Sequence, residues 1–236
     1  IFSRAVSAHG HRSVSAYLCA ATLAVVYCEL DRIDEAREVL ANRVGLLQWA
    51  MPDTMLRASI CRARLDLLQE SPAAAQAFLE RQERHFRSVG LERCMAHCLA
   101  EQLRIRLLAD DVEGATTCFA RLEPMAQVHT DSRGFLGEIP MLVHLSRARL
   151  ALATGDHAVA QVELQAVLDY ARENARGQLE VTALLLMALG RSAQRQQVAA
   201  EALLLEALQQ GLRGGLVRTF VDEGMGVFKL LGAQRS

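Results

Sequence analysis

The chain has 236 residues, of which 51% are hydrophobic and 5% aromatic, and its formal net charge is −1. A nearly neutral chain has no global field to attract nucleic acid or an anionic membrane, and no apolar run reaches the ~20 residues of a membrane span. Abundant Ala and Leu with only four prolines favour packed helices over strands.

The chain opens on Ile1 and shows no signal peptide, so we expect a piece of a longer cytoplasmic protein. Its six cysteines lie in helical patterns, which predicts buried, reduced thiols: Cys19, Cys28, Cys61, Cys94, Cys98 and Cys118.

A helix–turn–helix pattern begins at Leu30, where an apolar helix meets a polar turn and a second helix carries Ala36 and Leu40. The small residue recurs at Ala75, Ala115, Ala160, and Ala199 or Ala200. The spacings are 39, 40, 45 and 39 or 40, longer than the ~34 of the standard tetratricopeptide repeat. Two antiparallel helices approach closely only where one side chain is small, so each alanine marks a helical hairpin.

The pattern predicts an all-α fold: a right-handed α-solenoid of about five tetratricopeptide-like hairpins in a single domain over 1–236. The hairpins are expected at about 13–43, 54–88, 91–128, 137–175 and 178–211, with a short helix near 225–233. Val44–Asp53, which contains Trp49, and His129–Gly137 are expected to be irregular.

Turn residues agree with this division. Caps of second helices are expected at Asp31, Ser71 before Pro72, Asp111 and Asp156. Helix ends are expected at Gly90, Gly177 and Gly190, while Pro140 falls within a first turn.

The densest polar patch lies on the predicted helix 91–108. Arg93, His97, Glu101 and Arg104 are spaced 4, 4 and 3, which places them on one helical face. They are candidates for a ligand-binding strip, and the alternative is a solvated face in which Glu101 pairs with its neighbours.

Two other first helices carry similar strips: Arg57, Cys61 and Arg64 on one, and His144 and Arg147 on the other. First helices of such repeats line the concave face. If the strips stack, they form a channel rich in Arg and His that suits hydroxylated or anionic ligands.

Metal and catalytic chemistry are not indicated. Cys94-Met-Ala-His97-Cys98 lacks the fourth ligand of a structural zinc site, and we read His9-Gly-His11 as chance. The phosphate-binding, nucleophile-elbow and zinc-protease motifs are absent from the sequence, so we predict no catalytic residue, no metal and no enzyme activity.

The most specific stretch is Leu216-Val-Arg-Thr-Phe-Val-Asp-Glu-Gly224. It resembles the segment that closes the helical-repeat region of MalT-type regulators, which are large, ATP-binding, LuxR-family bacterial transcription regulators. The motif residues are Arg218, Phe220, Asp222, Glu223 and Gly224, and Met225 stands where family members often carry Pro. We expect Arg218 to pair either with Asp222, four residues on, or with an Asp or Glu of the preceding helix. Phe220 is expected to anchor in the last hairpin, and Gly224 to end the segment.

The resemblance implies an upstream nucleotide-binding (NTPase) module that takes ATP and a downstream helix-turn-helix module that binds DNA. This segment would carry no cofactor and make no direct contact with nucleic acid or membrane. It would sense a small-molecule inducer or a regulatory protein and help a cytoplasmic bacterial protein to form a homo-oligomer. The alternative is a general protein-docking scaffold outside transcription. A third hypothesis is an enzyme built on an α-solenoid, and the lack of an acid/base pocket would argue against it.

Overall fold

The computed structural model describes residues 14–41, 51–130, 132 and 134–233, and these residues form twelve helices and no strand. They gather into two compact units, Ile1–Ile105 and Arg106–Ser236, with the division inside one helix. The prediction of an all-α helical repeat is confirmed. In the described part of the chain, no helix is both long and apolar enough to cross a membrane.

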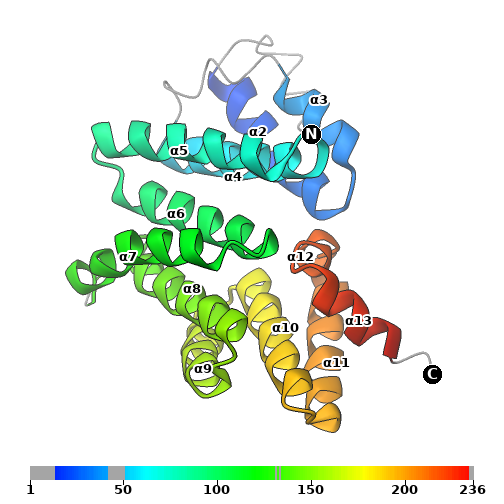
Figure 1. Ribbon diagram of the computed structural model, residues 1–236. Coiled ribbons are helices and arrows are strands. Elements are labelled where there is room, and N and C mark those ends of the chain that lie inside the picture. The colour runs from blue at the N-terminus through cyan, green and yellow to red at the C-terminus, as the bar shows by residue number, and fades with distance from the viewer. Residues whose placement is uncertain (1–13, 42–50, 131, 133, 234–236) are drawn as a thin grey trace. The chain divides into compact units, whose positions relative to one another are not determined.

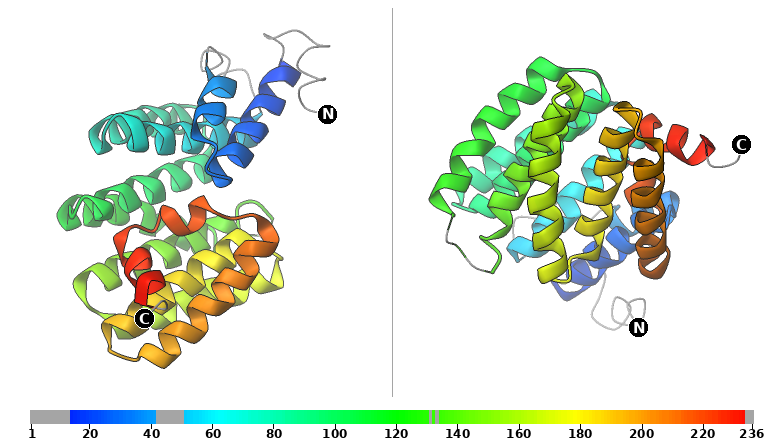
Figure 2. Two further views of the ribbon diagram at one scale, coloured as in Figure 1. Left: turned by 90° about the vertical axis from the view of Figure 1, so that its right-hand side faces the viewer. Right: turned by 90° about the horizontal axis from the view of Figure 1, so that it is seen from below.

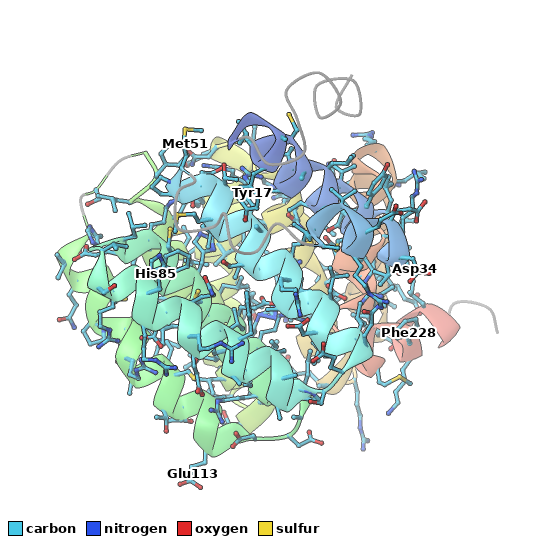
Figure 3. The ribbon with its side chains drawn as sticks, turned by 90° about the horizontal axis from the view of Figure 1, so that it is seen from above. Tyr17, Asp34, Met51, His85, Glu113 and Phe228 are labelled. Atoms are coloured by element: carbon cyan, nitrogen blue, oxygen red, sulfur yellow. The ribbon has the colours of Figure 1, made fainter. Side chains whose placement is uncertain are left out.

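Unit 1 holds two helical hairpins and most of a fifth helix (Figure 1). Its helices are α2 (Val14–Glu29), α3 (Ile33–Leu40), α4 (Pro52–Gln69), α5 (Pro72–Ser88) and α6 (Glu92–Leu108), the last belonging to it through residue 105. α2 packs on α3, α4 packs on α5, and α2 also packs on α4. Tyr17 (labelled in Figure 3), Leu79, Phe86 and Ile105 are the bulky residues buried in its core.

Unit 2 continues the repeat with successive antiparallel helices (Figure 2). They are α7 (Val112–Val128), α8 (Glu138–Thr154), α9 (His157–Glu173), α10 (Gly177–Ala193) and α11 (Gln197–Gly214). Two short helices, α12 (Arg218–Val221) and α13 (Met225–Ala233), then pack on α10. Val227 and Leu230 of α13 enter the core beside Leu184 and Leu204, while Lys229 between them is exposed.

The small alanines are buried as the repeat requires, and the structure selects Ala200 over the exposed Ala199. A left-handed residue stands five positions before four of the five alanines, with φ of 58–80°: Asp31, Asp110, Gly155 and Arg195. In these four hairpins the left-handed residue reverses the chain, so that the second helix begins with its small residue placed against the first helix. In the remaining turn, Glu70 has φ −108°, and Ser71-Pro72 starts the helix instead.

Three of the four expected caps are confirmed. Ser71, Asp111 and Asp156 each accept a hydrogen bond from the backbone N–H three residues on, at 2.8–3.1 Å. The prediction for Asp31 is wrong, because it occupies the left-handed turn position and Arg32 is the N-cap residue. Asp31 stands five residues before its alanine, whereas the true caps stand four before theirs.

Two of the expected helix ends are also wrong. Gly90 follows α5 with φ +71°, as expected, but Gly177 begins α10 and Gly190 lies inside it. A Cβ on Gly190 would lie 3.1 Å from Leu152 Cδ2, so this glycine serves close packing of α10 against α8. Pro140 does fall in the first turn of α8.

One boundary differs in the predicted irregular segment Val44–Asp53. α4 begins at Pro52, a proline at the first helical position, two residues before the expected start. Trp49, like His9 and His11, lies outside the described residues.

Candidate functional site

In unit 1, two of the selected arginines converge on one carboxylate. Asp53, in the first turn of α4, accepts hydrogen bonds from Arg57 Nε at 2.6 Å and from Arg93 Nη2 of α6 at 2.8 Å. Burial alone would raise the pKa of Asp53, but hydrogen bonds from the two guanidinium groups hold it below its ordinary value. The Asp53 side chain is 40% exposed, so this cluster faces solvent.

A second cluster in unit 1 is buried. Glu101 of α6 accepts from Arg64 Nε of α4 at 3.1 Å and from Arg104 Nη2 at 2.6 Å. Burial alone would raise the pKa of Glu101, but the charges of Arg104 and Arg64 and their hydrogen bonds keep it below its ordinary range. The expectation of a solvated face is therefore wrong for Glu101 and Arg104, although the expected pairing of Glu101 with its neighbours is present.

The thiols beside this strip are structural. His97 is half-buried on α6, while Cys94 and Cys98 are fully buried, and burial raises the pKa of both thiols. Among the described residues, no group of three or more His, Cys, Asp or Glu side chains is arranged to hold a metal ion.

In unit 2, His144 and Arg147 of α8 share a carboxylate from α9. His144 Nδ1 lies 2.5 Å from Glu163 Oε2, and Arg147 Nη1 donates to Glu163 Oε1 at 2.9 Å. Arg147 also donates to Glu123 of α7 at 2.7 Å, and its guanidinium lies 5.4 Å from the centre of the Phe119 ring. The α8 strip is thus tied to the second helices on either side.

The structure brings seven of the eight predicted residues together in three clusters, each organised by a carboxylate, while the eighth, His97, takes part in none of the hydrogen bonds given above. Asp53, Glu123 and Glu163 were missed from the sequence. Asp53 stands four residues before Arg57 on α4, a spacing that could have revealed it, whereas Glu123 and Glu163 lie on α7 and α9 and left no local signal. The predicted single channel would need strips from both units, and it stays a prediction.

The C-terminal motif closes unit 2 as expected in three respects. Arg218 donates to Asp222, Phe220 packs against the hydrophobic core of the last hairpin, and Gly224 adopts φ +85° at the end of the segment. A Cβ on Gly211 of α11 would lie 2.4 Å from Phe220 Cε2. The aromatic anchor therefore fits only because residue 211 has no side chain.

The fourth element of the motif is a long-range ion pair. Glu223 accepts two hydrogen bonds from Arg149 of α8, at 2.6 and 2.9 Å, and both side chains are about nine-tenths buried. The two residues are 74 positions apart, and no local pattern indicates that they pair. A bidentate pair of this kind fixes both distance and orientation, so it locks the turn between α12 and α13 against the repeat.

In the Asp53 and Glu101 clusters, two guanidinium groups converge on one carboxylate, which is the arrangement by which proteins commonly recognise carboxylate and phosphate groups. Comparisons with the curated proteins and with the solved structures found no match. The family described as the MalT-like TPR region matches the chain over residues 1–236. The chain, a helical repeat with an unusually long period that the Arg218–Gly224 segment closes, therefore belongs to the family of MalT-like tetratricopeptide (TPR) regions.

Proposed function

We propose that this chain is the effector-sensing and interaction domain of a MalT-like, LuxR-family transcription regulator of the bacterial cytoplasm, and not an enzyme. Membership of the MalT-like TPR family supports this role. ATP and DNA would be bound by other modules of the intact protein. The near-zero net charge agrees with a domain that leaves DNA contact to a separate module.

The observation that carries the proposal is the convergence of two guanidinium groups on the half-exposed carboxylate of Asp53. Two converging arginines also bind the carboxylate or phosphate of a ligand. An anionic or hydroxylated inducer could therefore take the place of Asp53 between Arg57 and Arg93. Glu101 is a poorer candidate for such exchange because its cluster is buried, and breaking a buried pair is strongly unfavourable.

The test is a thermal-shift screen of the 236-residue chain with phosphorylated, carboxylated and polyhydroxylated metabolites. A ligand of the folded state raises Tm, by mass action, as its concentration exceeds Kd. We expect Arg57→Ala and Arg93→Ala to abolish the shift, because these two side chains hold the Asp53 carboxylate. Arg104 is left intact, because its removal would weaken the pairing of the buried Glu101.

Arg32→Ala is the matched control, since Arg32 is an exposed arginine paired with Glu35 outside the clusters. It should retain the full shift. A ligand that raises the Tm of Arg57→Ala and Arg93→Ala as much as that of the unchanged chain would contradict the site assignment.

A regulatory protein as effector, and a homo-oligomer as the active form, are part of the same proposal. An effector changes the assembly state only if it binds one state more tightly than the other. Light scattering of the intact regulator, with ATP and with or without the effector, would then show a larger particle only when the effector is present. An unchanged mass would refute the oligomerisation role while leaving effector binding intact.

A further inference from the structure

The sulfur atoms of Cys28 and Cys61 are in contact inside unit 1. Cys28 lies in the last turn of α2 and Cys61 in the middle of α4, and their Sγ atoms are 3.0 Å apart. A bonded sulfur pair is separated by ~2.05 Å, so a disulfide requires an approach of about 1 Å. α2 and α4 pack directly on each other, and small side-chain rotations can supply such an approach.

This pair differs from the other close cysteines of the unit. Cys94 and Cys98 lie four residues apart on α6, so a bond between them would join no separate elements. A bond between Cys28 and Cys61 would instead join two hairpins whose cysteines are 33 positions apart. Two thiols in contact across a helix–helix interface can therefore do more than fill space.

In the closed fold the two thiols are protected. Their mutual hydrogen bond and burial raise the pKa of Cys61, against the opposing influence of the nearby Arg64 charge. Since the thiolate is the reactive form, oxidation has to wait for local opening. Cys28 lies in the last turn of α2, and the helix that follows, α3, has only eight residues and buries only Ala36 and Leu40, so local opening is expected at this end of the hairpin.

We propose that Cys28 and Cys61 form a redox modification site, which a hydroperoxide converts into a disulfide that fastens α2 to α4. One thiol loses its proton, and the thiolate attacks the peroxide oxygen to give a sulfenic acid and hydroxide, which takes up the proton to form water. The second thiol attacks that sulfur, the S–S bond forms, the S–O bond breaks, and a second water leaves. Two thiols and one hydrogen peroxide thus give one disulfide and two waters, and a dithiol reductant reverses the reaction.

The consequence is a covalent lock on the first hairpin. The cross-link restricts the unfolded chain and prevents α2–α3 from separating from α4, so the oxidised form should resist both heat and local opening. Peroxide would thereby change the mobility of one end of the repeat without occupying the arginine clusters.

The test uses the reduced 236-residue chain, treated with hydrogen peroxide, alkylated, digested and analysed by mass spectrometry. We expect one cross-linked peptide pair containing Cys28 and Cys61, a rise in Tm of about 5–10 °C, and reversal by dithiothreitol. The proposal is overturned if, after peroxide treatment, both cysteines can still be alkylated once the protein is unfolded in denaturant. It is also overturned if the cross-linked protein melts at or below the Tm of the reduced protein.

Matched variants separate this pair from general oxidation. Cys98→Ala removes a buried thiol on α6 and should keep the cross-link and the Tm rise, whereas Cys28→Ala and Cys61→Ala should lose both. An undiminished Tm rise in either of the last two variants would also overturn the assignment. The peptide analysis of the unchanged chain stands even if a variant fails to fold.

Discussion

Replacing Glu223 with Gln tests whether the C-terminal motif holds unit 2 together. The substitution keeps the size of the side chain but leaves Arg149 as a cation whose own side chain is 10% exposed. Removing one partner of a buried pair typically costs 3–5 kcal/mol, and the remaining amide oxygen can still accept one hydrogen bond. We therefore expect a loss of about 3 kcal/mol, equivalent to roughly 6–12 °C in Tm for a chain of this size.

Thermal and urea unfolding measure this loss, and amide exchange in α13 should accelerate at the same time. Glu35→Gln is the control, because the Arg32–Glu35 pair is exposed and should leave Tm nearly unchanged. The double variant Arg149→Met with Glu223→Leu should recover most of the stability, since it leaves no unpaired charge. If Glu223→Gln melts within the small shift of the control, the pair does not stabilise the closure of the repeat.

Three further substitutions or conditions probe packing, burial and charge. Gly211→Ala forces Phe220 to move, and such overpacking costs about 1–3 kcal/mol, whereas the better helix propensity of alanine returns up to ~1 kcal/mol. Urea unfolding should therefore show a net loss of stability, which a second substitution, Phe220→Leu, partly restores. A gain in stability would contradict the close contact. Tyr17→Phe removes a buried hydroxyl that has no hydrogen-bond partner among the described residues, so it should raise the free energy of unfolding by about 1 kcal/mol, and a loss would show that the hydroxyl is satisfied. Burial would raise the pKa of Glu163, but the hydrogen bond from Arg147 lowers it below its ordinary value. The ionised Glu163 therefore stabilises the fold above the unfolded-state pKa of about 4.3, and this stabilisation is lost as pH falls through the lower pKa of the folded state. Between pH 7 and pH 3, the Tm of Glu163→Gln should fall less steeply than that of the unchanged chain, and parallel curves would refute this.

The helices and their order could be predicted because local residues determine them. Buried alanines, capping side chains and prolines act within one or two turns of the chain, so hairpin boundaries followed from spacing alone. The conformations of the turn residues were harder to predict, because Asp110 and Arg195 adopt a left-handed conformation that glycine usually takes. Asp31 was misassigned as a helix cap because aspartate is common both in the left-handed conformation and at the N-cap position.

The candidate site was predictable only in part, because two of its carboxylates, Glu123 and Glu163, come from other helices than the cations they pair with. The cationic strips lie at helical spacing on one element and are visible in sequence, whereas Glu163 reaches His144 from 19 positions away. Glu101 and Arg104 resemble a solvated pair in sequence, and only the packing of α6 against α4 and α5 shows that they are buried. Arg149 and Glu223 could be paired only once α12 and α13 were known to pack beside α8 and α10.

The exposed Lys229 of α13 has a practical consequence for following this domain in solution. It is the only lysine among the 236 residues, so amine-reactive dyes at high pH label this side chain and, besides it, only an amino terminus. Val227 and Leu230 anchor the helix on both sides of the lysine, which leaves the label outside the core. A fluorophore on Lys229 can therefore report whether α13 stays docked when an effector is added, with no engineered attachment point.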